Sequence, residues 1–199
     1  QREAVTYNDG PSLVIAVAGS GKTRVLTHKI AYLLRLGIPS YRILAITFTN
    51  KAASEMKERI VQLVGAESAS QLWMGTFHSI AARILRREAD VIDFPSNFTI
   101  YDEDDSQKLI KVLIKEKGLD EKVYIPKEIA AIISRAKERL VTPAAYQNDA
   151  KTAEHNRMSN RPMIGDIYAT YQSRLRAAGS MDFDDLLLNL YLLYREHPD

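Results

Sequence analysis

The feature that most constrains the fold is a glycine-rich loop between a short apolar run and an amphipathic helix. The apolar run Leu13–Val17 predicts a buried strand, and the loop after it reads Ala18-Gly19-Ser20-Gly21-Lys22-Thr23. From Lys22 onward, apolar residues recur with helical spacing until Gly37, a typical residue just past a helix end. A strand, a loop containing Gly-Ser-Gly-Lys-Thr and a helix, in this order, predict a phosphate-binding loop (P-loop).

Each residue type in this loop suits the binding of phosphate. Gly19 and Gly21 allow backbone conformations that bring amide N–H groups close to phosphate oxygens. Lys22 can reach the β- and γ-phosphates of a nucleotide, and the hydroxyl of Thr23 can bind Mg²⁺. The general pattern begins with glycine where this chain has Ala16, which the loop tolerates if that position needs no positive φ. The alternative is a glycine-rich turn between strand and helix that binds no ligand.

Two more pairs of strand and helix follow this loop. Apolar runs predict strands over residues 43–48 and 72–75, and apolar periodicity predicts helices from Thr49 or Asn50 to Gly65 and from about Phe77 to Ala89. This alternation is typical of a parallel sheet with crossover helices. Phe48 and Phe77 both lie where a strand ends and a helix begins, which is the ligand-binding edge of such a sheet.

The pattern changes near residue 94, after which the sequence is mostly helical. The predicted helices cover residues 104–117, 126–140 and 162–177, residues 120–125 and 148–161 are predicted connectors, and a last amphipathic helix begins at Asp182. We therefore expect a second, all-α unit over residues 94–178.

The composition places the chain among globular proteins. Of its 199 residues, 46% are hydrophobic and 26% are charged. The chain has no cysteine, which excludes disulfides, thiolate zinc sites and a cysteine nucleophile, and which suits a reducing cytoplasm. It has no apolar run of about 20 residues and no signal-peptide pattern, so no membrane span is expected.

The net charge of +2 does not by itself indicate a nucleic-acid binder, but the charge is unevenly distributed. Residues 106–140 hold nine Lys or Arg against five Asp or Glu, and residues 151–176 hold five against two. A basic helical face of this kind can be a nucleic-acid surface or an ordinary solvated face. Lys108, Lys111 and Lys115 are the residues on which the two interpretations can be tested.

Two acidic clusters, Asp102–Asp105 and Asp182–Asp185, also have two interpretations each. The first could supply the Asp that a nucleotide-hydrolysing site needs at the end of an apolar strand, and the second could be a metal cluster. Both could instead be helix starts, since carboxylates are favoured at helix N-termini, and we interpret them as helix starts.

The Asn50-Lys51 pair lacks the Asp of a guanine-binding motif, because Ala53 stands in its place. The chain therefore contains half of a nucleotide-hydrolysing site.

Five segments now form an ordered series: Gln1–Val5, Ala16–Thr23, Ile46–Ala53, Gly75–Ser79 and Asp182–Leu186. The series resembles the N-terminal helicase motifs of superfamily 1 DNA helicases of the UvrD/Rep/PcrA type, and the resemblance covers essentially the whole chain. One departure is Val17, where the family usually has glycine. The change could alter the flexibility of the loop, but we do not expect it to abolish phosphate binding.

The resemblance implies an α/β fold: the parallel sheet of a RecA-like P-loop NTPase with an inserted all-α subdomain. Residues 1–93 would form the first part of the ATP-binding core, residues 94–178 the helical insertion, and residues 179–199 the return to the core. The family's Walker B Asp-Glu pair and its second RecA-like domain, with catalytic arginines, are expected beyond this chain. The chain alone is therefore expected to be inactive as a helicase.

The resemblance also implies site residues. Those expected to bind ATP are Gln1, Ala18, Gly19, Ser20, Gly21, Lys22, Thr23 and Arg24, with Lys22 and Thr23 in catalytic roles and Thr23 on Mg²⁺. Those expected to bind DNA are Phe48, Thr49, Asn50, Thr76, Phe77, His78 and Phe183. Sequence-tolerant binding of a single strand needs aromatic faces for the bases and polar or basic groups for the phosphates, and this set contains both kinds.

The implied function is that of an ATP-dependent 3′-to-5′ DNA helicase in the cytoplasm, with ATP and Mg²⁺ as cofactors. Its expected substrates are single-stranded DNA and 3′-tailed duplex DNA, in repair or replication. Two other functions stay open. One is a DNA- or protein-binding module whose phosphate loop is inactive. The other is a small-molecule kinase, although no general base or lid motif is visible for it.

Overall fold

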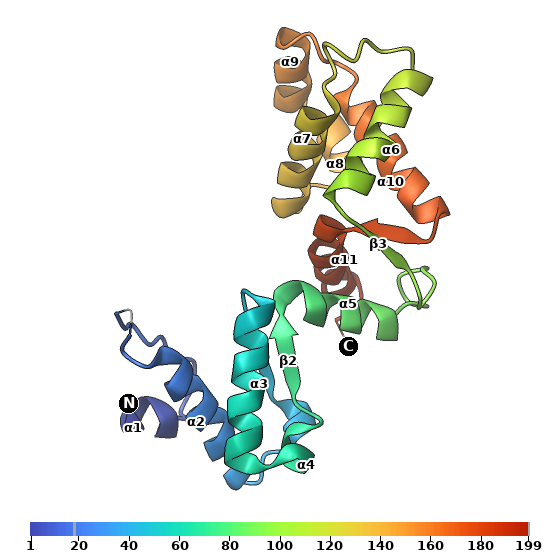
Figure 1. The fold of residues 1–199 in the computed structure, drawn as a ribbon. Coiled ribbons are helices and arrows are strands. Elements are labelled where there is room, and N and C mark those ends of the chain that lie inside the picture. Colours follow the sequence, from blue (N-terminus) through green and yellow to red (C-terminus); the bar gives the residue numbers. More distant parts are fainter. Residues whose placement is uncertain (18, 199) are drawn as a thin grey trace. The chain divides into compact units, whose positions relative to one another are not determined.

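The structure, a computed structural model, describes residues 1–17 and 19–198. The chain divides into two compact units, Gln1–Ile80 and Ala81–Asp199. The elements of the first unit are α1 (Arg2–Thr6), α2 (Lys22–Arg35), the 3₁₀ helix η1 (Ser40–Arg42), β1 (Leu44–Thr47), α3 (Asn50–Val64), α4 (Ala66–Ala69), β2 (Trp73–Thr76) and the start of α5 (Phe77–Arg87) (Figure 1).

The first unit is built around a β1–α3–β2 crossover. The two strands pair in parallel, with Leu44 opposite Trp73 and Thr47 opposite Thr76. The predicted strands at 43–48 and 72–75 and the predicted helix between them are thus confirmed. Helix α3 turns its apolar side, with Met56 and Ile60, into the core of this unit, as residues four apart on a helix share one face.

The predicted strand at Leu13–Val17 is wrong. No strand is assigned to these residues, and the side chains of Leu13, Ile15 and Val17 are 88%, 89% and 79% exposed, not buried. An apolar run becomes a strand only where a neighbouring strand pairs with its backbone. Within residues 1–17 and 19–198, the sheet of the first unit consists of β1 and β2, and neither pairs with this segment.

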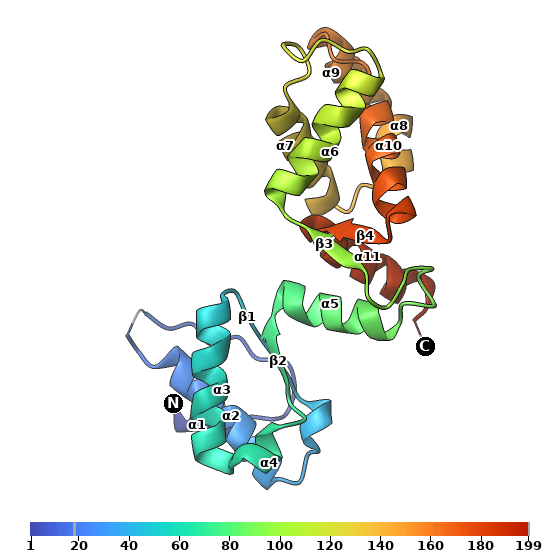
Figure 2. The same cartoon turned by 45° about the vertical axis from the view of Figure 1, so that its right-hand side comes forward.

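The second unit is mostly helical. After the end of α5 it contains β3 (Thr99–Tyr101), α6 (Glu103–Glu116), α7 (Pro126–Glu138), α8 (Pro143–Asn148), α9 (Ala150–Met158), α10 (Ile164–Ala177), β4 (Ser180–Asp182) and α11 (Phe183–Glu196). Strands β3 and β4 pair in parallel, and Figure 2 shows them side by side below α6 and α10. The segment predicted to be all-helical therefore also contains a short strand, β3.

Two apolar clusters stabilise the second unit. One joins α6, α7 and α10 and includes Leu113, Ile129 and Tyr168. The other joins the end of α5 to β4 and α11 and includes Leu85 and Met181. The helices predicted over 104–117, 126–140 and 162–177 and the helix from Asp182 are all present within two or three residues.

The prediction of a connector at residues 148–161 is wrong, because α9 occupies most of it, and α8 was not predicted. Helix α9 begins where the Asp149 side chain accepts a hydrogen bond from the backbone N–H of Thr152 at 3.0 Å. Its sequence is mostly polar, so the apolar periodicity that predicts a helix is weak there. No helix in the part of the chain that the structure describes is long and apolar enough to cross a membrane.

Candidate functional site

The glycine-rich loop before α2 is turned back on itself. The backbone N–H and the hydroxyl of Ser20 both donate to the carbonyl oxygen of Val17, at 3.3 and 2.6 Å. Gly19 and Gly21 have φ values of +79° and +85°, which residues with a Cβ rarely adopt. The conformation therefore requires glycine at both positions. Ala18, predicted to bind ATP, lies outside the described residues.

Lys22 holds its ammonium group over this loop. Its Nζ donates to the carbonyl oxygens of Ala16 and Val17, at 3.0 and 2.8 Å. The hydroxyl-bearing side chain of Thr23 is exposed in the same helical turn. The positive charge of Lys22 is thus held against the loop, where an anion would have to bind.

The N-terminus of α2 is left open to an anion. Its N-cap is Gly21, which offers no side-chain acceptor, and the first turn contains no acidic residue. The first N–H groups of a helix have no partner within the helix and carry a partial positive charge. In contrast, an Asp caps both α6 and α11 and further acids follow it. The start of α2 is therefore suited to a phosphate group.

The structure brings Gln1 and Arg24 to the same place as the loop. The Gln1 amide Nε2 donates to the Ser20 carbonyl oxygen at 2.8 Å. Gln1 and Arg24 also line a cavity of about 310 Å³, together with Arg2, Val5, Val25 and His28. A Cβ on Gly21 would lie 2.8 Å from Gln1 Nε2, the flexible end of that side chain, so the positive φ is the main reason for glycine at this position. These two predicted ATP-binding residues and the loop thus share one surface.

A second group of predicted residues lies at the carboxyl ends of β1 and β2. Because Thr47 pairs with Thr76, the residues that follow them, Phe48 and Phe77, come next to each other. Their ring centroids are 5.5 Å apart and their planes are tilted by 44°. Phe48 is 88% exposed and Phe77 is 44% exposed. The two rings form an aromatic surface, hereafter the Phe48–Phe77 pair.

The polar residues beside this pair hold the helix starts. The Thr49 hydroxyl accepts a hydrogen bond from the Ala52 N–H at 3.1 Å, so Thr49, and not Asn50, is the one of the two predicted candidates that caps α3. Thr76 and Ser79 exchange hydrogen bonds at the start of α5, with the Thr76 N–H donating to Ser79 Oγ at 2.8 Å. Asn50 is exposed in the first turn of α3, whereas His78 is half-buried.

Phe183, also predicted to bind DNA, lies in the second unit, as the first residue of α11, and is 54% exposed. It lines a cavity of about 520 Å³ with Tyr101, Tyr171 and Lys127 among other residues. Within the first unit the predicted DNA residues thus surround the Phe48–Phe77 pair, and within the second unit Phe183 lies at the start of α11.

Both acidic clusters are helix starts, as interpreted from the sequence. The Asp102 side chain accepts from the Asp105 N–H at 2.8 Å and caps α6. Asp182 and Asp185 form a reciprocal capping box at the start of α11. Within residues 1–17 and 19–198, no group of three or more His, Cys, Asp or Glu side chains is placed to hold a metal ion.

Sequence reasoning missed the residue that joins these last acids. Lys137, on α7, is buried and contacts both Asp182 and Asp185. A signal was available, since Lys137 follows Ile129 and Ile133 at intervals of four on the buried face of α7.

The basic face of α6 is partly neutralised. Lys111 and Lys115 lie 3.9 and 3.5 Å from Glu121, and Lys108 lies 3.9 Å from Asp105. All three lysines remain more than half exposed. Both interpretations of this face, as a nucleic-acid surface or as a solvated one, therefore stay open.

Comparison with known proteins identifies the family. Residues 1–199 match the model of the UvrD/REP helicase N-terminal domain. The chain is 46% identical to the ATP-dependent DNA helicase PcrA of Staphylococcus aureus and of Staphylococcus epidermidis, and 44% identical to that of Leuconostoc citreum, each over 200 residues. The chain belongs to the UvrD/REP helicase N-terminal domain family, which confirms the resemblance inferred from the motifs. Each alignment covers 100% of the chain and 26% of the relative's length.

Proposed function

We propose that this chain is the N-terminal, ATP-binding part of an ATP-dependent 3′-to-5′ DNA helicase. The names of the relatives support the activity, and membership of the family supports a RecA-like fold in which residues 1–93 and 179–199 form the core and residues 94–178 an insertion. Single-stranded DNA and 3′-tailed duplex DNA would be its substrates. Repair or replication in the cytoplasm would be its setting.

Nucleotide binding is supported by three features that lie together at one surface. The turned loop with Lys22, the open N-terminus of α2, and the cavity lined by Gln1 and Arg24 adjoin one another. The cavity would take the base, because a glutamine amide can donate to and accept from the edge of adenine. Lys22 and the loop N–H groups would hold the β- and γ-phosphates. Bound through the exposed Thr23 hydroxyl, Mg²⁺ would supply charge neutralisation on those phosphates.

The Phe48–Phe77 pair supports the DNA part. Its rings are exposed at the carboxyl edge of a parallel sheet, where ligands bind in α/β folds. Base stacking on such rings is tolerant of sequence, which suits a protein that moves along a strand. Thr49, Asn50, Thr76 and His78 lie beside the rings and would contact the sugar-phosphate backbone.

In the whole protein, hydrolysis would also use the family's Walker B acids and the arginines of a second RecA-like domain. Opening and closing of the nucleotide cleft would then move the Phe48–Phe77 pair along one strand. The longer protein should unwind a 3′-tailed duplex in the presence of ATP and leave a 5′-tailed duplex intact. Unwinding of both, or of neither, would contradict this polarity.

The nucleotide assignment is tested on the chain itself by competition between ATP and GTP. The chain should bind ATP more tightly than GTP, and Gln1→Ala should remove most of this preference. Equal affinity for the two nucleotides in the unsubstituted chain would refute the role of Gln1. A small-molecule kinase would instead transfer phosphate without further domains and would not respond to single-stranded DNA. A nucleotide-independent module would bind DNA and show no nucleotide binding at all.

A further inference from the structure

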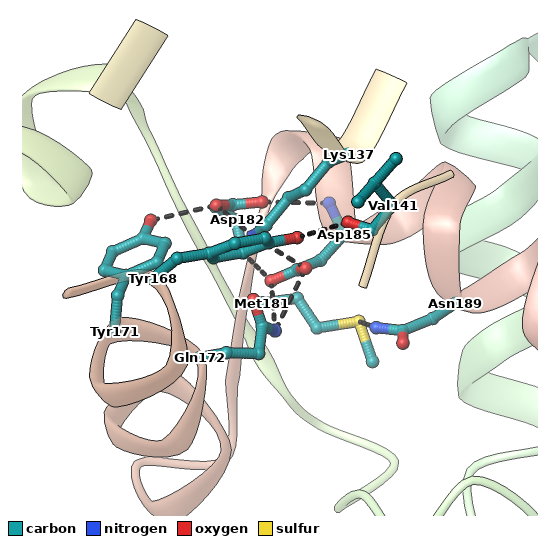
Figure 3. A network of polar contacts seen from close by, with 9 residues as sticks. All are labelled: Lys137, Val141, Tyr168, Tyr171, Gln172, Met181, Asp182, Asp185 and Asn189. Carbon is teal, nitrogen blue, oxygen red and sulfur yellow. Dashed lines mark hydrogen bonds and ion pairs between the residues drawn. The ribbon is translucent and has the colours of Figure 1, made fainter. Parts of the chain in front are cut away.

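A buried ionic network lies at the start of α11, outside the nucleotide site. Lys137 Nζ lies 2.6 Å from Asp182 Oδ2 and 2.7 Å from Asp185 Oδ1. The side chains of Lys137 and Asp185 are 0% exposed and that of Asp182 is 10% exposed. Figure 3 shows the lysine reaching from α7 to the two carboxylates. Lys137, Asp182 and Asp185 are called the buried triad below.

All four carboxylate oxygens of the triad accept hydrogen bonds. Asp182 Oδ2 also accepts from the Tyr171 hydroxyl at 2.9 Å, and Gln172 Nε2 donates to both oxygens of Asp185 at 3.0 Å. The remaining bonds are those of the capping box, from the N–H groups of Asp185 and Asp182. Burial raises the pKa of Tyr171, so its hydroxyl stays protonated and donates. Side chains of α7 and α10 thus hold the first turn of α11.

A buried ion network of this kind is better explained by the arrangement of helices that it fixes than by a gain in folding stability. The cost of removing three charges from water cancels much of their attraction, and well-packed apolar residues often stabilise a protein as well. Hydrogen bonds to every carboxylate oxygen do, however, favour one arrangement of the elements that carry them, although the neighbouring Gln172 Oε1 is buried without a hydrogen-bond partner. Here that arrangement is the position of the α11 N-terminus against α7 and α10.

Phe183 lies inside the clamped turn. Its neighbour Asp182 and, two residues on, Asp185 are buried in the triad, whereas the Phe183 side chain is 54% exposed. Strand β4 adds a second restraint, because Asp182 pairs with Tyr101 of β3. The backbone on both sides of Phe183 is therefore fixed while its ring stays at the surface.

We propose that the buried triad positions Phe183 for stacking on a base of single-stranded DNA, which makes Lys137 a positioning residue for DNA binding. Rigid placement matters because an aromatic ring that is already oriented loses less conformational entropy on binding. The inference rests on the proposed function, since it assumes that Phe183 contacts DNA.

The test is a double-mutant cycle between the triad and Phe183, read as affinity for a fluorescent oligo-dT strand. Lys137→Met alone leaves two buried carboxylates without their cation and could prevent folding. The cycle therefore uses a neutral triad, Lys137→Met with Asp182→Asn and Asp185→Asn, which keeps the size of the side chains and an N-cap acceptor. Far-UV circular dichroism and urea unfolding verify that each variant is folded. The neutral triad removes one positive and two negative charges, so Glu154→Gln, at an exposed glutamate on α9, controls for the net gain of one positive charge.

In the parent background, Phe183→Ala should weaken binding by about 5-fold to about 150-fold, the effect of one lost base stack. In the neutral-triad background the same substitution should weaken it by less than about 2-fold, because the ring is no longer held in place. If the triad is only structural, neutralising it lowers stability, but Phe183→Ala keeps its full effect on affinity in the folded protein. That result would overturn the proposal.

The cycle also separates this proposal from the proposed function. If the parent binds oligo-dT but Phe183→Ala has no effect there, no DNA contact exists for the triad to position, and the proposal is overturned while DNA binding stands. If the parent does not bind oligo-dT, both are contradicted. A large Phe183→Ala effect that disappears only when the triad is neutral supports both.

Discussion

Replacing Phe48 by Ala separates a binding role from a packing role more clearly than any other substitution in the first unit. Phe48 is 88% exposed, so it buries only about 25 Å² within the chain, which corresponds to about 0.6 kcal/mol of stability. Its contact with the Phe77 ring, at 5.5 Å, adds about 0.5 kcal/mol or somewhat more. The free energy of unfolding should therefore fall by about 1 kcal/mol.

The expected effect on DNA binding is larger. Loss of one base stack costs about 1–3 kcal/mol, which raises the Kd for single-stranded DNA by about 5-fold to about 150-fold. Phe77 is 44% exposed and buries much more of its surface, so Phe77→Ala should lower stability and affinity together. Phe48 is thus the better test, because only its effect on affinity is expected to be large.

The assay is fluorescence anisotropy of a labelled oligo-dT strand at fixed low salt, with urea unfolding of the same samples. Salt must be held constant because phosphate contacts make affinity depend strongly on it. Tyr41→Ala is the matched control, since Tyr41 is a 62% exposed aromatic residue of the same unit. A DNA-binding role for Phe48 is refuted if Phe48→Ala binds oligo-dT as tightly as the parent, or if Tyr41→Ala weakens binding equally.

Three further predictions concern stability and the loop. Burial raises the pKa of Asp185 from 3.8 to about 6, so the folded state binds this proton more tightly than the unfolded state. The resulting contribution to stability is fully present below pH 3.8 and is lost as the pH rises through 6. The stability advantage of the parent over Asp185→Asn, measured by urea unfolding, should therefore shrink from pH 4 to pH 6.5; an advantage that grows would contradict this. Thr49→Ala removes the cap of α3 and should lower the free energy of unfolding by about 1 kcal/mol, whereas Thr49→Ser should lower it much less. Gly21→Ala forces a Cβ into a left-handed position beside Gln1 and should lower stability by about 1–2 kcal/mol and weaken ATP binding; unchanged thermal unfolding would count against the loop conformation.

The sequence predicted best those features that depend on neighbouring residues. Thr49, Asp102 and Asp182 were each identified as helix starts, because a cap and its partner lie three residues apart. Strands β1 and β2 were predicted from apolar runs, and their pairing follows from the crossover helix between them.

Features that depend on distant partners were not predictable in the same way. The run Leu13–Val17 has the composition of a strand, but whether it becomes one depends on a neighbouring strand that composition does not specify. Lys137 looks like an ordinary helical lysine until the fold brings Asp182 and Asp185, 45 and 48 residues away, into contact with it. Likewise, the expectation that Gln1 belongs to the same site as the phosphate loop followed from the family resemblance and not from local spacing.

Lys22→Ala is the sharpest test of the claim that the loop before α2 binds the phosphates of ATP. Hydrogen bonds to charged groups contribute about 1.5–3 kcal/mol, so the variant should bind ATP about 10-fold to about 150-fold more weakly in isothermal titration calorimetry. Arg35→Ala removes an equal charge from the same helix about 20 Å further along and should leave the affinity nearly unchanged. A Lys22→Ala chain that binds ATP as tightly as the parent would contradict the claim.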